Sequence, residues 1–384
     1  MRRRSSILSI LLILGASACL DRIYIDIGTV AFNTIVINGS ITNDPGPYQV
    51  ILSLAFDIES KESLRNPITA KRVLISDNEG TSEELTEASE GIYVTRADGI
   101  QGTVGRAYML HVELPDGRIY ESVPDTLFES GKIDSLYAVF TEERALSNNA
   151  TLYGFDVKFN PSIASGHNKL MWKFTGTFQS DTYPEFKDKE PCGEITCQGC
   201  NRCNFVPLCT GLRNVSPFPG ITRAVFVRVG PCECCTCWYN FFNSQPLLSD
   251  DQYAQQGQLR TQTAMHIPLD AWMFQYRVYA QVSQFTLSRQ AFDFWRAVRD
   301  QKGAINSLFQ PVTGKIKGNF IQVSGPAVGV EGLFFAAGIA SKSIFIDRDD
   351  VRSGVPIPEP GVGFAESCLK LFPYATNQKP AYWE

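Results

Sequence analysis

The segment WMFQYRVYAQV, residues 272–282, sets the fold class of this chain. Apolar residues occupy every second position, whereas Gln275, Arg277 and Gln281 occupy the positions between them. The apolar series is Trp272, Phe274, Tyr276, Val278, Ala280 and Val282. Because successive side chains of a strand point to opposite faces, this alternation predicts a strand with one buried face and one solvated face. The chain is therefore expected to be mainly β.

One helix is predicted directly after this strand, over residues 288–302. Ser288 stands where a hydroxyl can cap the first turn, and Gly303 is expected to end the helix. The apolar residues that recur at helical spacing are Ala291, Phe294, Trp295 and Val298. This is the only helix that the pattern supports strongly.

Strands are expected on both sides of the helix, in a β-rich domain over residues 130–351. The predicted strands are 133–141, 151–159, 169–178, 318–323 and 331–347. A proline-rich stretch follows, so residues 352–384 are expected to form an irregular C-terminal tail.

A separate Ig-like β-sandwich is predicted over residues 33–124. Tyr48–Phe56 alternates apolar and polar residues, and residues 106–122 form a hairpin pattern with Asp116-Gly117 at the turn. Several short strands between Gly, Asn and Asp clusters are typical of a sandwich. Residues 125–132 are expected to link it to the second domain.

The first 18 residues have the features of a signal peptide. Arg2–Arg4 form a positive region, Ile7–Leu14 an apolar run too short to span a bilayer, and small residues precede Cys19. This pattern resembles a bacterial lipobox, which predicts that Cys19 carries lipid and that residues 19–32 form a tether. The alternative is an ordinary signal peptide cleaved near Ala18.

The charge of the chain argues against nucleic-acid binding. Removal of residues 1–18 leaves 366 residues, enough for two domains, with 32 Lys and Arg residues against 40 acidic ones, a net charge of −8. Neutralising phosphates requires a basic face. No later segment has the length of apolar sequence needed to cross a membrane, so attachment is expected through the lipid.

Ten cysteines follow Cys19, and nine of them fall in an insert over residues 190–238. They are Cys192, Cys197, Cys200, Cys203, Cys209, Cys232, Cys234, Cys235 and Cys237, with Cys368 alone in the tail. In an exported chain an even number of cysteines predicts disulfides that staple a loop-rich insert. Cys234 and Cys235 are expected to bond to different partners, because adjacent cysteines rarely meet the geometry of a mutual disulfide.

Two metal hypotheses compete with the disulfides. Cys197 and Cys200 could join Cys234 and Cys237 in a four-thiolate zinc site. The spacing of Cys192, Cys197 and Cys200 matches the start of an iron–sulfur motif, which export argues against. No cofactor or metal is expected.

Short motifs over most of the chain resemble the DUF4249 family of Bacteroidota lipoproteins. They are Val36–Gly39, Asp44–Tyr48, Ala70–Val73, Gly91–Tyr93, Tyr279–Ser283, Phe292–Trp295, Asn306–Pro311, Gly318–Phe320 and Lys379–Trp383. The resemblance implies an outer-membrane lipoprotein encoded beside a TonB-dependent transporter, with a carboxypeptidase-regulatory-like N-terminal sandwich. It supplies no catalytic residues.

Few residues suggest chemistry. His111, His167 and His266 share no metal or catalytic spacing, so an enzyme is not expected. Four aromatic residues after the insert could stack on a sugar or meet a protein, although core packing also explains them. These candidates are Trp238, Tyr239, Phe241 and Phe242.

Together these features predict a non-enzymatic, lipid-anchored protein of the cell outer membrane, facing the periplasm or the surface. We expect an accessory or binding component that works with a TonB-dependent transporter in nutrient or peptide capture. The alternatives are a disulfide-stapled surface adhesion or structural protein and a hydrolase without a recognisable motif.

Overall fold

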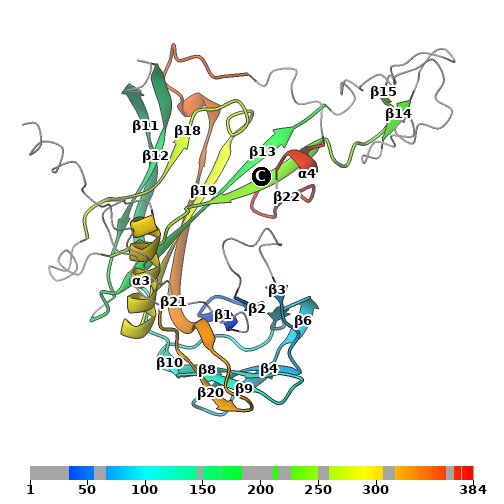
Figure 1. Cartoon of the computed structure of the whole chain (residues 1–384). Coiled ribbons are helices and arrows are strands. Elements are labelled where there is room, and N and C mark those ends of the chain that lie inside the picture. Colours follow the sequence, from blue (N-terminus) through cyan, green and yellow to red (C-terminus); the bar gives the residue numbers. More distant parts are fainter. Residues whose placement is uncertain are drawn as a thin grey trace, which may run out of the picture.

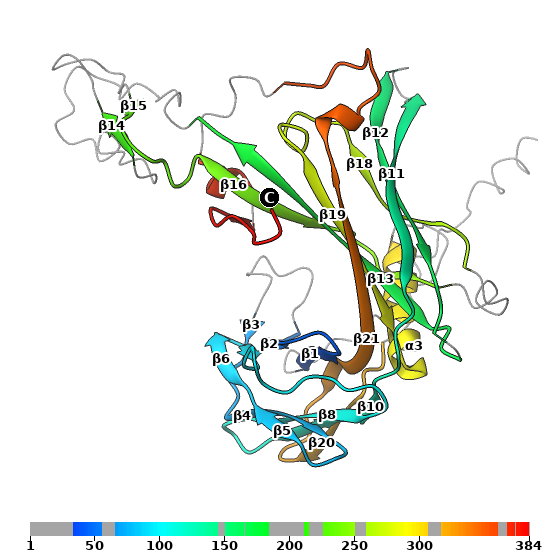
Figure 2. The same cartoon turned by 180° about the vertical axis from the view of Figure 1, so that it is seen from behind.

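Strands dominate the described part of the chain, and the prediction of a mainly β fold is confirmed (Figures 1 and 2). This computed structural model describes residues 34–55, 66–144, 150–164, 166–183, 211–214, 226–249, 259–305, 316–359, 367–372 and 374–383. The predicted signal peptide, the tether, Cys19 and most of the cysteine-rich insert lie outside these residues.

The longest sheet passes through both halves of the molecule. Its strands are β1 (Ile35–Thr42), β2 (Gln49–Leu54), β3 (Asn66–Pro67), β6 (Thr86–Ser89), β7 (Ile92–Val94), β13 (Leu170–Asp181), β16 (Thr236–Phe242), β17 (Leu247–Leu248), β19 (Val278–Thr286), β21 (Val330–Ile346) and β22 (Ala375–Thr376). They run in the order β22-β16-β13-β19-β21-β1-β2-β7-β6, with β17 on β13 and β3 on β2.

Three smaller sheets complete the described strands. The second sheet has β4 (Arg72–Asp77), β5 (Ser82–Glu84), β8 (Ala107–Glu113), β9 (Ile119–Ser122), β10 (Asp125–Thr126) and β20 (Phe320–Ser324). The third has β11 (Ile133–Arg144), β12 (Thr151–Pro161) and β18 (Gln262–Pro268). The fourth is a pair, β14 (Leu212–Asn214) and β15 (Phe226–Arg228).

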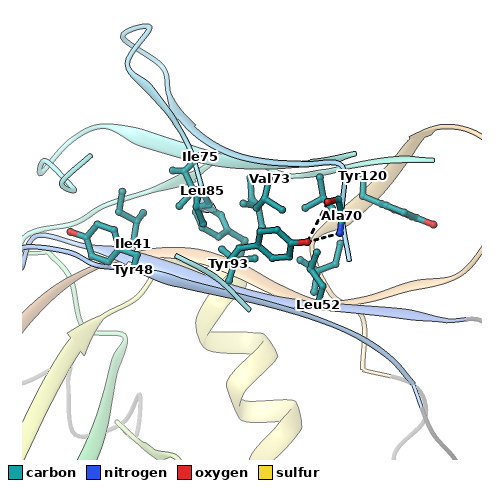
Figure 3. Packing of buried hydrophobic residues seen from close by; sticks show 14 of the residues in the cluster. Ile41, Tyr48, Leu52, Ala70, Val73, Ile75, Leu85, Tyr93 and Tyr120 are labelled. Atoms are coloured by element: carbon teal, nitrogen blue, oxygen red, sulfur yellow. Dashed lines mark hydrogen bonds between the residues drawn. The ribbon is translucent and has the colours of Figure 1, made fainter. Parts of the chain in front are cut away.

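An N-terminal sandwich forms where the β1, β2 and β7 end of the long sheet packs on the second sheet. Alternate residues of each strand, such as Val50, Leu52, Val73 and Ile75, fill its core (Figure 3). The hydroxyl of Tyr93 accepts a hydrogen bond from the Ala70 amide at 2.6 Å. The hairpin predicted over residues 106–122 is confirmed as β8 and β9, which pair around the Asp116-Gly117 turn.

Strand β21 joins this sandwich to the second half of the molecule. Its first part, Val330–Ala337, pairs in parallel with β1, and its last part, Gly338–Ile346, pairs antiparallel with β19. Phe334 and Ala336 lie in the N-terminal core, and β20 adds an edge to the second sheet. Segments far beyond the predicted bounds of 33–124 therefore complete the sandwich.

A second sandwich lies above the first in Figure 1. There the third sheet packs on β13, β19 and the end of β21, around aromatic residues that include Phe155, Phe159, Trp172 and Phe174. The predicted strands at 133–141, 151–159, 169–178, 318–323 and 331–347 correspond to β11, β12, β13, β20 and β21. Along β12, for example, alternate residues are buried in this core, as expected for a strand with one buried face.

Helix α3 (Arg289–Ile305) covers the opposite face of the long sheet. Ala291 and Phe292 are buried against Leu333 and Phe335 of β21. Ser288 caps the helix as predicted, because its hydroxyl oxygen accepts a hydrogen bond from the Ala291 amide at 3.1 Å. The expected end at Gly303 is wrong by two residues.

The start of one predicted strand needs correction. The strand predicted at 272–282 begins only at Val278, because the carboxylate of Asp270 accepts hydrogen bonds from the Trp272 and Met273 amides and holds a turn there. Val278, Ala280 and Val282 are fully buried as expected, but Tyr276 is 41% exposed.

The C-terminal tail is more ordered than the prolines suggest. It contains a short helix, α4 (Cys368–Leu371), and β22, which pairs with β16. A 3₁₀ turn, η2 (Arg348–Asp350), follows β21. The predicted linker at 125–132 is also structured, since β10 pairs with β8 and Leu127 is fully buried.

Candidate functional site

Lys173 occupies an unusual place in the middle of the long sheet. Its strand neighbours, Trp172 and Phe174, point into the second core, so Lys173 projects from the opposite face, toward α3. Its Nζ atom lies 5.0 Å from the ring centroid of Phe285 and 5.7 Å from that of Trp295. Ring faces attract a cation at these distances.

The Lys173 side chain is exposed to solvent, and aromatic rings flank its ammonium on the protein side. Desolvation lowers the pKa of Lys173 below its ordinary value, because removing water disfavours the charged form. The residue lines two adjoining cavities, which explains how it remains reachable from solvent while packed among aromatic rings.

The first cavity has a volume of about 520 Å³ and lies between α3, β21 and the outward faces of β1 and β2. Phe294, Trp295 and Val298 of α3 form its apolar wall, and Leu333 and Phe335 of β21 extend that wall. Its other lining residues are Val36, Asn38, Gly39, Ser40, Gln49, Ile51, Lys173, Ile316, Glu331 and Gly332. Cavities of this size and lining are typical of small-molecule sites.

The second cavity has a volume of about 420 Å³ and shares Lys173 and Trp295 with the first. The Nζ atom of its other lysine, Lys302, donates a hydrogen bond to the Ser244 carbonyl at 3.0 Å. Its other lining residues are Met171, Phe174, Thr175, Phe242, Asn243, Ser244, Gln245 and Pro246. The described residues that line it therefore contain two lysines and no carboxylate, which favours a negatively charged occupant.

The four candidate aromatic residues divide according to the two faces of β16. Tyr239 and Phe241 point into the second core, and the Phe241 ring packs over Gly176, where a Cβ atom would lie 2.1 Å from it. Trp238 points the other way but is covered by Trp383. The binding interpretation is therefore wrong for the two buried residues, Trp238 and Phe241, because both pack in cores.

Phe242 is the exception among these four residues. It lies on the same face as Trp238, is 57% exposed and lines the second cavity. A binding role for it is consistent with its position.

All five described cysteines are in disulfides, and they lie at the base of the insert. Cys235 is bonded to Cys232, whereas Cys234 is in a different disulfide, as expected for the adjacent pair. Cys237 is bonded to Cys368, which ties the C-terminal tail to β16. Cys192, Cys197, Cys200, Cys203 and Cys209 lie outside the described residues.

These bonds conflict with the zinc hypothesis at the two of its ligands that the structure describes. A sulfur in a disulfide is not a thiolate, so Cys234 and Cys237 are not available as ligands. Elsewhere in the described ranges, no group of three or more His, Cys, Asp or Glu side chains is placed to hold a metal ion.

The three histidines lie apart and each has a local partner. His111 pairs with Glu121, with 3.0 Å between Nδ1 and Oε1, and His266 with Asp156, with 2.9 Å between Nδ1 and Oδ1. His167 stacks on Phe128. The structure does not bring them together.

Sequence reasoning missed Lys173 and Lys302. A lysine on the polar face of a predicted strand is usually solvated, and nothing local to residues 169–178 indicates that α3 covers that face. In the sequence, Lys302 can be recognised only as a basic residue near the end of the predicted helix.

The family model described as a domain of unknown function (DUF4249) matches residues 22–343. The chain therefore belongs to the DUF4249 family, whose description names no function. No curated protein and no solved structure matches the chain. None of the described helices is long and apolar enough to cross a membrane.

Proposed function

We propose that this chain is a non-enzymatic, lipid-anchored binding protein of the outer membrane that works with a TonB-dependent transporter in nutrient or peptide capture. The observation that carries the proposal is the pair of adjoining cavities beside α3, the first with an apolar and aromatic wall and the second with mostly polar lining residues. That combination suits ligand binding, since apolar walls supply burial and the polar groups fix orientation.

The lipid anchor in this proposal rests on the sequence before the described residues. Cys19 follows a signal-like segment, and only a short tether separates it from β1. Replacement of Cys19 by Ser removes the thiol that would carry lipid. We expect the wild type to partition with membranes and to gain the mass of a diacylglyceryl group, and Cys19→Ser to lose both.

Co-purification tests the transporter partnership. A C-terminally tagged chain is recovered from its own cells in mild detergent, beside an unrelated tagged lipoprotein as the control. Specific recovery of a TonB-dependent transporter supports the proposal. Its absence under conditions that preserve known transporter complexes contradicts the partnership.

A surface adhesion or structural protein is the second candidate, favoured by the arm that carries the cysteine-rich insert. Strands β13 and β16 pair as far as Asp181 and Thr236, and β14 and β15 lie beyond them at the far end of the arm (Figures 1 and 2). The Cys232–Cys235 and Cys237–Cys368 disulfides fix the base of this arm.

Excision of the arm separates the two candidates. Because Asp181 and Thr236 are register partners, residues 182–235 can be replaced by an Asn-Gly turn that keeps β16 and the Cys237–Cys368 disulfide. Adhesion predicts loss of cell attachment with normal nutrient uptake. Unchanged attachment contradicts the second candidate.

A further inference from the structure

We propose that the two cavities form one site for a small amphipathic carboxylate, with the carboxylate at Lys173 in the second cavity and the apolar body against α3 in the first. This inference rests on the proposed binding function and specifies the chemical class of the ligand.

Lys173 supplies the anion-binding group. Within the described part of the chain its ammonium contacts the ring faces of Phe285 and Trp295 and no carboxylate. Ring faces do not neutralise the charge of an ammonium, so Lys173 can still form a charge-assisted hydrogen bond with an incoming carboxylate. A cationic ligand would gain nothing there and would meet repulsion.

The second cavity accommodates the rest of the carboxylate group. Asn243, Gln245 and Thr175 supply polar atoms, and Lys302 adds a second positive charge at the rim. Since Lys302 already donates to the Ser244 carbonyl, Lys173 remains as the ammonium without a hydrogen-bonded oxygen partner among the described residues. One such ammonium balances one negative charge, which favours a monoanion.

The first cavity accommodates the apolar body. It opens from the same Lys173 and Trp295 pair and continues along Phe294, Val298 and Phe335. Among the described lining residues, the acidic Glu331 on β21 belongs to the first cavity, and none of those that line the second cavity is acidic. This asymmetry orients the ligand with its carboxylate toward the second cavity.

Three probes with one apolar body test the inference: 4-phenylbutyrate, 4-phenylbutan-1-ol and 4-phenylbutylamine. Their affinities for the purified full chain are measured by titration calorimetry, with tryptophan fluorescence as a second signal for contact near Trp295. We expect the carboxylate to bind at least about tenfold more tightly than the alcohol, because only the carboxylate forms a charge-assisted hydrogen bond with Lys173. The amine should bind least.

Variants locate the site. Lys173→Met, which keeps the length of the side chain without its charge, should weaken the carboxylate about tenfold or more and leave the alcohol unchanged. Lys173→Arg keeps the charge and should restore most of the affinity. Lys132→Met changes an exposed lysine at the start of β11 and should have no effect. Thermal unfolding shows whether each variant is folded. If Lys173→Met does not fold, Lys302→Met serves as the second test, and it should also weaken binding of the carboxylate.

The outcomes separate this inference from the proposed function. Equal binding of the three probes, no binding, or carboxylate affinity that survives Lys173→Met overturns the inference. If the transporter nevertheless co-purifies in that case, the proposed partnership is supported and only the carboxylate site is rejected. Selective carboxylate binding without a transporter supports the site and contradicts the partnership.

Discussion

The carboxylate of Asp125 accepts a hydrogen bond from the backbone amide of Ala336 at 3.0 Å, across 211 positions of sequence. The hydroxyl of Ser288 donates to the same carboxylate, and the Ser288 oxygen caps α3. A single buried side chain thus joins the segment between the two sandwiches, the middle of β21 and the start of the helix that lines both cavities.

Removal of this carboxylate should destabilise the protein. Asp125→Ala leaves the Ala336 amide buried without an acceptor, so the free energy of unfolding should fall by about 1–3 kcal/mol in urea denaturation. Asp125→Asn keeps an oxygen acceptor and should cost less. Asp98→Asn, at an exposed site, serves as the control. Equal stability of Asp125→Ala and wild type contradicts this role.

The same residue predicts a pH dependence. Burial raises the pKa of the Asp125 carboxyl above its ordinary value of 3.8. The folded state then holds the proton more tightly, so the stabilisation that depends on protonation is complete below pH 3.8 and is lost as pH rises through the raised pKa, while the hydrogen bond from Ala336 remains. The difference in unfolding free energy between wild type and Asp125→Asn should therefore decline over that window. A flat difference would show that the pKa is not raised.

Gly332 should tolerate no side chain. Its φ is +103°, and a Cβ atom there would lie 2.0 Å from the Ile37 carbonyl oxygen on β1. Gly105, with φ +88° and open space around it, is the matched control. Gly105→Ala should cost about 1–2 kcal/mol, and Gly332→Ala at least about 4 kcal/mol or failure to fold. Similar costs would mean that β1 and β21 can move apart.

The two described disulfides should differ in their effect on stability. Cys237–Cys368 spans 131 positions, and Cys232–Cys235 spans three. Since constraining a longer loop removes more freedom from the unfolded chain, Cys237→Ser with Cys368→Ser should cost about 2–5 kcal/mol, and the Cys232 and Cys235 double variant less. Peptide mapping without reductant checks both pairings. A Cys234–Cys235 bond would contradict the structure.

Lys173 should make the free energy of unfolding depend on pH in the alkaline range. Because its pKa is lowered, the unfolded chain binds this proton more tightly, and stability should rise with pH between the lowered pKa and the ordinary value of 10.5. Lys173→Met lacks this rise, so the unfolding free energy of wild type relative to the variant should increase across that window. Chemical denaturation at a series of pH values measures it, with Lys132→Met as the control. An unchanged difference would place Lys173 in water.

The elements that sequence could predict are those whose partners lie nearby or whose pattern is local. The β8–β9 hairpin follows from Asp116-Gly117, and α3 from its cap and spacing. Strand β21 is different, because Phe334 and Ala336 enter one core while Leu333 and Phe335 lie under α3. Burial of both faces removes the alternation, and no local signal pairs it with β1.

The candidate site shows the same limit. The prediction of binding aromatics followed from composition near the insert, yet Trp383, some 145 positions away, decides that Trp238 is covered and leaves Phe242 exposed. Lys173 gains its properties from α3 and Trp295, which lie more than a hundred positions later. The burial of Trp238, the exposure of Phe242 and the aromatic surroundings of Lys173 all depend on contacts with distant segments of the chain.

The parallel pairing of β1 with β21 also sets an order of events during synthesis. β1, the first of the described strands, pairs with residues 330–337 of a 384-residue chain, so its edge stays open until they are made. Until then Ile35 and Ile37 lack the Phe334 and Ala336 side chains that complete their core. The N-terminal sandwich therefore matures late, and a polypeptide released before β21 emerges exposes an unpaired edge to its neighbours.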